Sequence, residues 1–235
     1  MTLLALETSG DTAKQACDLR AQLRLMAWLS PAFPIGGFAY SGGLEHAVAD
    51  RLVTDAAGLK IWVDTAIRQG SAWNDAVLLV EAHRCFEDAV ALATCAELGL
   101  ALAGSAERYA ETSALGLGFV EAARAWPCPV FERLPVTLPY PVAVGALAAA
   151  HDIAADKTVA AYLSAFAGQC VSAGIRLSVI GQRHGVSLLA ELETLVAETA
   201  LRAGASSLDD LGSATILGEI SQLRHETQPV RLFRS

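Results

Sequence analysis

The sequence contains few charged side chains and very little lysine. Charged residues make up 18% of its 235 positions, and lysine occurs only at Lys14, Lys60 and Lys157. The formal net charge is −8, and arginine and lysine form no cluster along the chain. Because proteins that bind phosphate backbones need a basic surface, nucleic acid is not an expected ligand.

Sequence motifs for metals and nucleotides are also missing. No cysteines or histidines have the short spacing typical of a zinc or nickel site, and the five histidines fall in separate segments. A P-loop lysine motif is absent, and Gly116-Leu117-Gly118 matches only part of a dinucleotide-binding motif without a preceding strand. The sequence therefore predicts a protein that is not an enzyme and has no metal site or cofactor of its own.

The sequence contains few cysteines, and their spacing does not suggest a set of disulfide bonds. The five cysteines are scattered over the chain, whereas secreted disulfide-rich domains carry a dense and even set. Residues 3–6 are apolar, but the run is too short for a signal peptide and no positive charge precedes it. We therefore expect a protein of the reducing cytoplasm.

The chain is rich in apolar residues with helix-forming spacing. Apolar residues make up 53% of it, which favours burial against a partner or a second copy. Strand signals are weak, while apolar positions recur at intervals of three and four residues. We predict an all-α fold, a single-domain helical bundle over residues 23–220. Residues 1–22 are predicted to be a flexible segment, and residues 221–235 a mobile tail that binds a partner.

One apolar stretch, residues 159–180, is nearly long enough to cross a bilayer. It contains Gln169 and Arg176, and a charged side chain in mid-membrane costs about 2.5 kcal/mol or more. We therefore predict a packed core helix and no membrane insertion. Its small residues, among them Ala165 and Gly168, allow neighbouring helices to approach closely.

A stretch rich in proline and glycine, residues 29–46, interrupts the helical pattern. Pro31 and Pro34 oppose a helix, while the pairs Gly36-Gly37 and Gly42-Gly43 permit backbone angles that other residues resist. Large aromatic side chains alternate with these glycines: Phe33, Phe38 and Tyr40. The stretch predicts a shaped loop that packs closely against another surface. A buried turn between two helices is the alternative.

Three segments together carry a family signature. The first is the loop from Leu29 to Glu45, and the second joins Arg176-Leu177 to Ile180-Gly181-Gln182 and Gly185. The third is His225-Glu226-Thr227-Gln228 followed by Arg231-Leu232-Phe233-Arg234-Ser235. In order and spacing these segments resemble the UreF family of urease accessory proteins. Pro229-Val230 departs from the family pattern, in which an aromatic-Ser pair is expected.

The resemblance implies a cytoplasmic all-α homodimer that joins the accessory protein UreD, also called UreH, and recruits the GTPase UreG. That assembly would dock on apo-urease and support GTP-dependent nickel insertion, with the metal held by the partners. The chain would then act as a scaffold and a GTPase regulator. The alternative is a small helical metal carrier or enzyme that uses the dispersed histidines.

The resemblance also implies which residues contact partners. The matching positions are Phe33, Pro34, Gly36, Gly37, Tyr40, Gly43, Glu45, Arg176, Gln182, His225, Glu226, Arg231, Leu232, Phe233, Arg234 and Ser235. In the tail, Leu232 and Phe233 would be apolar anchors on UreD, and the two arginines would donate charge-assisted hydrogen bonds. In the loop, three residues would face the GTPase-binding side: Phe33, Tyr40 and Glu45. Core filling is the alternative for Phe33 and Phe38.

Arg176 has more than one interpretation. A buried arginine needs a carboxylate or carbonyl partner, and the apolar surroundings favour such a structural pair. A surface arginine close to the GTPase is the second possibility. In that position it could also stabilise charge during phosphoryl transfer, as a trans-acting arginine does.

Overall fold

The computed structural model describes residues 3–235, without the side chains of residues 3–11 and 13. This part of the chain folds into α-helices and short 3-10 helices with no strand, so the all-α prediction is confirmed. The α-helices are α1 (Leu3–Trp28), α2 (Leu44–Ala49), α3 (Ala56–Gln69), α4 (Ser71–Arg84), α5 (Ala89–Ala101), α6 (Ala106–Ala123), α7 (Tyr140–Ala150), α8 (Ala155–Arg176), α9 (Gln182–Gly204) and α10 (Ile216–His225). The 3-10 helices are η1 (Gly37–Ala39), η2 (Pro129–Glu132) and η3 (Leu208–Asp210).

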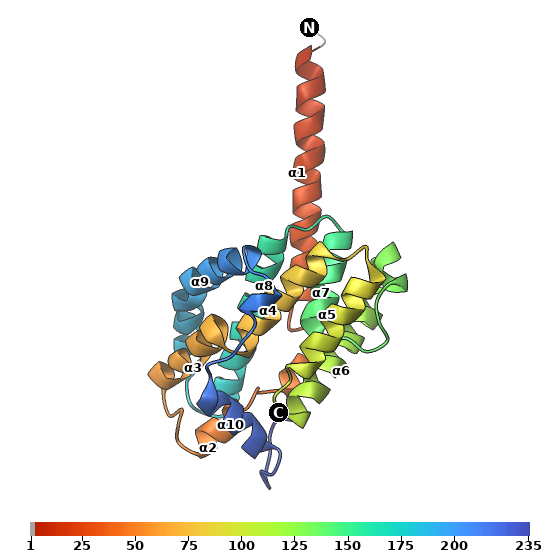
Figure 1. The fold of residues 1–235 in the computed structure, drawn as a ribbon. Helices are drawn as coiled ribbons and strands as arrows, with labels where there is room; N and C mark the ends of the chain where they lie inside the picture. Colours follow the sequence, from red (N-terminus) through yellow and green to blue (C-terminus); the bar gives the residue numbers. More distant parts are fainter. Residues whose placement is uncertain (1–2) are drawn as a thin grey trace.

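Helices α4 and α7 form the centre of the body. Every residue of α7 from Pro141 to Ala149 is buried, because a helix without a polar face can pack only inside a core. Gly145 allows the close approach of α4, since a Cβ atom there would lie 2.1 Å from the carbonyl oxygen of Leu79. Helices α8 and α9 pack together on one flank of this centre, and α5 and α6 lie on the other (Figure 1).

Local capping explains where several helices begin and end. Asp55 caps α3, because its carboxylate accepts a backbone amide of the first turn, and Gly70 ends the helix. Helix α4 stops at Arg84, and α5 starts only at Ala89. The reason is Asp88, whose carboxylate accepts two backbone amides of α5 and so starts a new helix.

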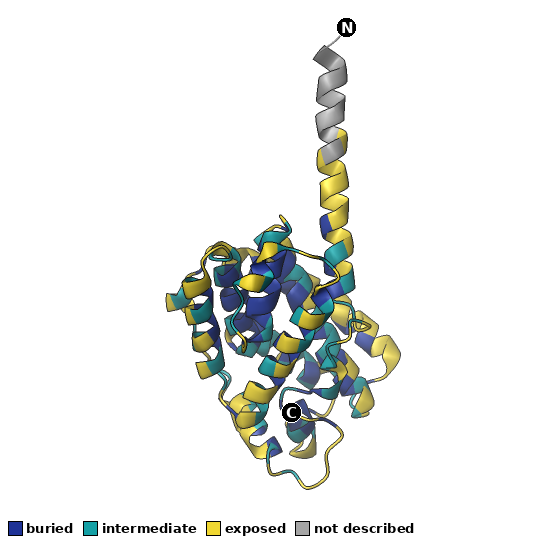
Figure 2. Cartoon of the chain, turned by 90° about the vertical axis from the view of Figure 1, so that its right-hand side faces the viewer, coloured by how far each residue is buried: buried dark blue, intermediate teal, exposed yellow. Residues whose placement is uncertain are grey.

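Helix α1 projects from the body as a long arm (Figures 1 and 2). The sequence predicted helix only from about residue 23, whereas α1 already begins at Leu3. The amphipathic pattern was a poor guide here, because the buried positions among the described side chains of α1 lie toward its end, at Ala21, Leu25 and Trp28. Residues 1 and 2 lie outside the described part, and the flexibility predicted for residues 1–22 stays a prediction.

Helix α8 contains the stretch whose length suggested a membrane span. It is the one described helix that is long and apolar enough to cross a membrane, by length and composition only, and half of its apolar window is buried inside the body. Helices α3, α4, α7 and α9 contact it. Its outward side, with Ser164, Gly168 and Ser172, lines a groove of about 1070 Å³ between the end of α1, the loop, α3 and α10.

Candidate partner-binding surface

The proline- and glycine-rich loop, α2, α10 and the C-terminal tail form one end of the molecule (Figure 1). Two glycines shape this end. Gly36 has φ 75° and Gly43 has φ 81°, a conformation that favours glycine. A Cβ atom at Gly43 would also lie 2.9 Å from the backbone nitrogen of Gln222, so this glycine lets α2 and α10 touch. We call the assembly of residues 36–46 with residues 225–235 the clasp.

Backbone hydrogen bonds hold the tail against the loop. The amide of Arg234 donates to the carbonyl oxygen of Ala39 at 2.7 Å, and the amide of Ser41 donates to the carbonyl oxygen of Ser235 at 2.8 Å. Phe233 is buried beneath them in the core cluster. The structure therefore packs the tail on the body, whereas the sequence predicted a mobile segment. Backbone pairing and burial of an aromatic ring are the physical reasons for the difference.

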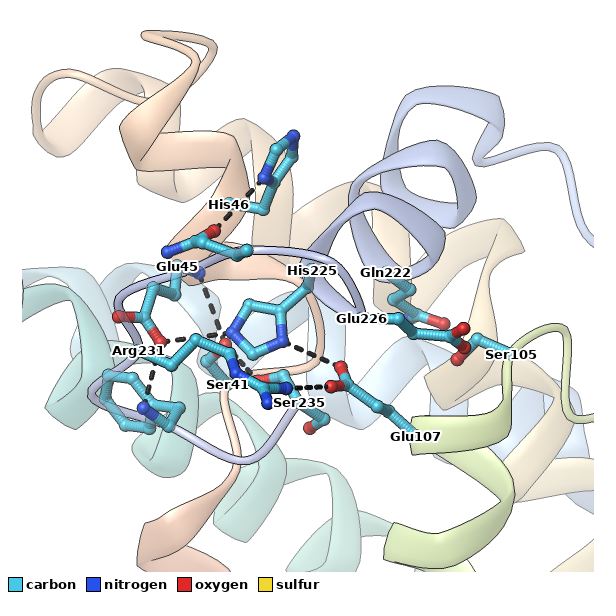
Figure 3. A network of polar contacts seen from close by, with 12 residues as sticks. Ser41, Glu45, His46, Ser105, Glu107, Gln222, His225, Glu226, Arg231 and Ser235 are labelled. Atoms are coloured by element: carbon cyan, nitrogen blue, oxygen red, sulfur yellow. Dashed lines mark hydrogen bonds and ion pairs between the residues drawn. The ribbon is translucent and has the colours of Figure 1, made fainter.

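Glu45 is the central acceptor of the clasp (Figure 3). Its carboxylate accepts the backbone amides of Leu232 at 2.7 Å and Phe233 at 2.9 Å, and it lies 3.1 Å from Nε2 of His225. Burial raises the pKa of Glu45, but the hydrogen bonds from these three residues outweigh that effect and leave it below its usual value. Glu45 is thus a buried carboxylate that fixes the tail, and its predicted contact with a partner stays a prediction.

His225 ends α10 and is fully buried. Its Nδ1 lies 2.7 Å from a carboxylate oxygen of Glu107 on α6, and its Nε2 faces Glu45 on α2. The guanidinium of Arg231 donates to the second oxygen of Glu107 at 2.6 Å. Glu226 then caps α6, because its carboxylate accepts the amide of Ala106 at 2.8 Å. These contacts join α2, α6, α10 and the tail in one network (Figure 3).

A second buried cluster continues from the last residue of the tail. Ser235 donates its hydroxyl to Glu111 at 3.0 Å, and Glu111 lies 3.5 Å from Nη1 of Arg108. Nη2 of Arg108 contacts Asp75 at 2.7 Å, and the Tyr162 hydroxyl also donates to Asp75 at 2.8 Å. The tail is therefore bonded to a buried polar network that reaches from α6 across α4 to the Tyr162 hydroxyl on α8.

The pKa values within this second cluster depend on the balance between burial and ion pairing. Burial lowers the pKa of Arg108, but the charges of Asp75 and Glu111 outweigh burial and raise it above its usual value. Burial raises the pKa of Glu111, and Arg108 and the Ser235 hydroxyl offset this only in part. Docking of Ser235 therefore stabilises the ionised form of Glu111.

Arg176 ends α8 and is exposed, so the prediction of a buried pair was wrong. Its guanidinium donates to the carbonyl oxygen of Phe38 and lies over the ring of Phe233, 4.1 Å from the centroid. The sequence analysis expected either a carboxylate or a carbonyl partner for Arg176, and the structure provides a carbonyl oxygen. Because a helix terminus faces solvent, the charge keeps its hydration while the side chain links loop and tail.

The loop aromatics are arranged differently from the prediction. Tyr40 is buried and Phe33 is half-buried against Phe119 and Trp126, so both help to form the core. Phe38 is 72% exposed at the tip of η1 and is the aromatic side chain of the loop that faces solvent. A run of alternating aromatics could not show which ring would point outward, because η1 breaks the alternation.

The remaining predicted residues divide between the clasp and other surfaces. Leu232 is exposed on the tail. Gln182 is exposed at the first position of α9, and no hydrogen bond between described residues joins it to the clasp. The sequence analysis missed Glu107, although its position two residues after the helix-capping Ser105 is a common place for an acidic residue. It also missed Asp75 and Arg108, for which the sequence held no signal.

In the described part of the chain, no group of three or more His, Cys, Asp and Glu side chains is arranged to hold a metal ion. The fold and site define the class of protein: an all-α protein in which the C-terminal segment is clasped against a glycine-rich loop. At this end it exposes apolar and basic side chains, among them Phe38, Leu232 and Arg234.

Comparison with known proteins identifies the family within this class. The UreF family model matches residues 53–193. The urease accessory protein UreF of Rhizobium leguminosarum bv. viciae is 62% identical over 218 residues, which cover 93% of this chain and 98% of the relative. UreF of Agrobacterium fabrum is 60% identical over 92% of this chain and 96% of its own length, and UreF 1 of Brucella canis is 54% identical over 92% and 94%. The chain belongs to the UreF family of urease accessory proteins and has a role in urease maturation.

Proposed function

We propose that this chain is a cytoplasmic, non-enzymatic scaffold that brings UreD/UreH and the GTPase UreG together on apo-urease during GTP-dependent nickel insertion. The observation that carries the proposal is the clasp, which joins the tail and the loop into one solvent-facing surface. Family membership supports the link to urease maturation, and the exposed side chains of the clasp support contacts with other proteins.

The tail and α10 supply the surface proposed for UreD/UreH. Apolar side chains are exposed along one side of α10 and on the neighbouring tail: Leu217, Ile220, Leu223, Val230 and Leu232. Arg224, Arg231 and Arg234 are exposed among them. An apolar patch with a basic rim fits a partner surface that is apolar at its centre and acidic at its edge. Phe233 is removed from the predicted anchors, because it packs inside the molecule.

The loop supplies the surface proposed for the GTPase. Phe38 projects from η1, and Arg176 fixes the backbone beneath it through the carbonyl oxygen. An exposed aromatic side chain on a held backbone is typical of an interface anchor, because little conformational freedom is lost on binding. Phe38 therefore takes the role that the sequence analysis gave to Tyr40. Regulation of GTP hydrolysis would follow from contact at this surface.

The groove along α8 supports the proposed homodimer. Its wall combines small residues of α8 with exposed apolar side chains from other helices, such as Met26 and Ile61. Small residues permit a close approach of two helices, and a second copy would bury an apolar area that a monomer leaves in water. This face adjoins the tail surface proposed for UreD/UreH, because Leu217 of α10 belongs to both.

The test is complex formation by the full-length chain with Leu232→Asp. This change places a charge at an exposed anchor that is 54% accessible, so the isolated protein should keep its fold. We expect light scattering on size-exclusion fractions to show a complex of this chain with UreD/UreH and UreG, and its loss in the variant. Leu201→Asp, at an exposed leucine of α9, is the matched control and should assemble normally.

Two results would contradict the proposal. One is an intact complex with Leu232→Asp, which would remove the tail from the UreD/UreH interface. The other is the absence of any complex with the unaltered chain. Stoichiometric nickel binding by the isolated protein would then favour a metal carrier that uses its dispersed histidines.

A further inference from the structure

Helix α1 is apolar on two opposite sides near the point where it joins the body. One side is buried and consists of Ala21, Leu25 and Trp28. The other side, which we call the ridge, consists of Leu19, Leu23 and Met26. These three residues are spaced by four and three positions and so share one face of the helix, and at about 100° per residue that face points away from the buried one. A helix that is apolar on both sides is typical of an element that is covered on both sides.

The ridge faces solvent in the single chain. Its side chains are between 60% and 64% exposed, and exposed residues prevail along the described part of the arm (Figure 2). A single exposed apolar side chain is common on protein surfaces, but a stripe of three marks a surface that another protein covers.

The groove along α8 begins beside the ridge. Met26 belongs to both, because it is the last residue of the ridge and also lines the groove. The lining from α8 consists of small residues such as Ala165 and Gly168, and no atom lies within 4 Å of the position that a Cβ atom of Gly168 would take. Other elements add exposed apolar side chains to the wall, among them Ile61 of α3 and Leu217 of α10. The protein therefore carries an apolar ridge and an apolar groove side by side.

The ridge and the groove also agree in size. An α-helix about 10 Å wide rises about 5.4 Å per turn, so one turn fills about 400 Å³. The groove of about 1070 Å³ thus has room for about two and a half turns. The segment from Leu19 to Met26 spans about two turns.

We propose that the groove holds the ridge of a second copy of this chain, while the groove of the second copy holds the ridge of the first. This inference rests on the homodimer proposed above and specifies which segment occupies the groove. Each chain contributes one ridge and one groove, so a two-fold axis closes the contact at two chains. Because the ridge and the groove match and both belong to this chain, a second copy fits the groove better than an unrelated partner.

The first measurement is light scattering on size-exclusion fractions of the full-length chain. The unaltered chain should be a dimer, and Leu23→Asp should raise its dissociation constant more than about tenfold, because a charge would enter an apolar groove. Leu23 is exposed in the single chain, so the variant should keep its helix content and melting temperature. Leu201→Asp is the matched control, at a similarly exposed leucine of α9 outside the groove, and should stay dimeric.

Gly168→Leu tests the groove itself. Open space surrounds this glycine, so the larger side chain should fit the folded chain but fill the room that the ridge needs. The dimer should weaken as it does with Leu23→Asp. Gly204→Leu is the control, because Gly204 is another helical glycine with open space at its Cβ position and does not line the groove.

Cross-linking identifies the segment that occupies the groove. One chain would carry Leu23→Cys and a second, larger tagged chain Gly168→Cys, both with Cys17→Ser because Cys17 is the exposed one of the five thiols. A short bismaleimide should join the two chains in the mixture. A mixture with Val136→Cys in place of Leu23→Cys should give no such product, because Val136 is exposed outside the groove.

The outcomes separate this inference from the proposed homodimer. Loss of the dimer in Leu23→Asp and Gly168→Leu, together with the cross-link, supports both. A dimer that both variants leave intact, without the cross-link, overturns the inference and leaves the homodimer standing. An unaltered chain that is monomeric at micromolar concentration overturns both.

Discussion

At the scale of the residue, Glu45 shows how one buried carboxylate can serve several partners. It accepts two backbone amides and faces one histidine nitrogen, so all of its strong contacts are to the C-terminal segment. Most buried carboxylates need such compensation because the charged form loses its hydration. Glu45 ends a family signature segment, and its contacts within the protein give a reason for a carboxylate at this position.

Glu45→Gln should destabilise the protein by about 1.5–3 kcal/mol. The variant keeps the size of the side chain but replaces one of the two oxygens that accept the amides of Leu232 and Phe233, and losing a buried hydrogen bond to a charged group typically costs about 1.5–3 kcal/mol. Urea unfolding measures the difference in the free energy of unfolding. Glu191→Gln, which removes the exposed ion pair with Lys60, is the control and should change it by less than about 0.5 kcal/mol. Equal effects of the two variants would contradict this account of Glu45.

At the scale of the element, glycines within helices have opposite roles according to what lies next to them. Gly145 on α7 sits against the backbone of α4, while Gly168 on α8 opens onto the groove, and no atom lies within 4 Å of the position that a Cβ atom would take there. The two helices therefore show how packing, and not helix propensity alone, determines whether a glycine is required.

Gly145→Ala and Gly168→Ala should shift stability in opposite directions. The first places a methyl group 2.1 Å from a carbonyl oxygen and should cost about 1–3 kcal/mol or more. The second replaces glycine by a better helix former in open space and should stabilise the monomer by about 0.5–1 kcal/mol. Thermal unfolding of both variants is the measurement. A Gly145→Ala protein as stable as the unaltered chain would contradict the close approach of α4 and α7.

At the scale of the whole molecule, the burial of each cysteine distinguishes the core from the exposed arm. All five are free thiols, and burial raises the pKa of Cys95 and Cys170 to about 12, whereas Cys17 is exposed on α1. A thiol reacts as its thiolate, so a buried thiol with a raised pKa is protected from alkylation. Cys95 on α5 and Cys170 on α8 lie in the body, whereas Cys17 lies on the arm that α1 forms.

Alkylation of the native protein at about pH 8 should label Cys17 within minutes and leave Cys95 and Cys170 unlabelled until the body unfolds. Raising the pH to about 9 should leave the two core cysteines protected, because their pKa lies far above this pH. Peptide mass spectrometry after timed labelling measures each site. Early labelling of Cys170 would show that α8 is open to solvent on its inner side.

Helix periodicity, capping residues and turn residues determined the all-α class and many helix boundaries before any tertiary contact was considered. Asp55 and Gly70 are examples, because capping and chain breaking act within a few residues and can be inferred locally. The three signature segments likewise pointed to the UreF family. These signals lie in the order of residues along the chain.

Only the tertiary structure decided which signature residues face solvent. His225 meets Glu107 across 118 positions of sequence and Glu45 across 180, and no local pattern marks such a pairing. The exposed aromatic of the loop is Phe38 and not Tyr40, Arg176 is at the surface, and Phe233 lies inside. Local sequence sets the backbone of each element, whereas the orientation and burial of a side chain depend on segments that only folding brings together.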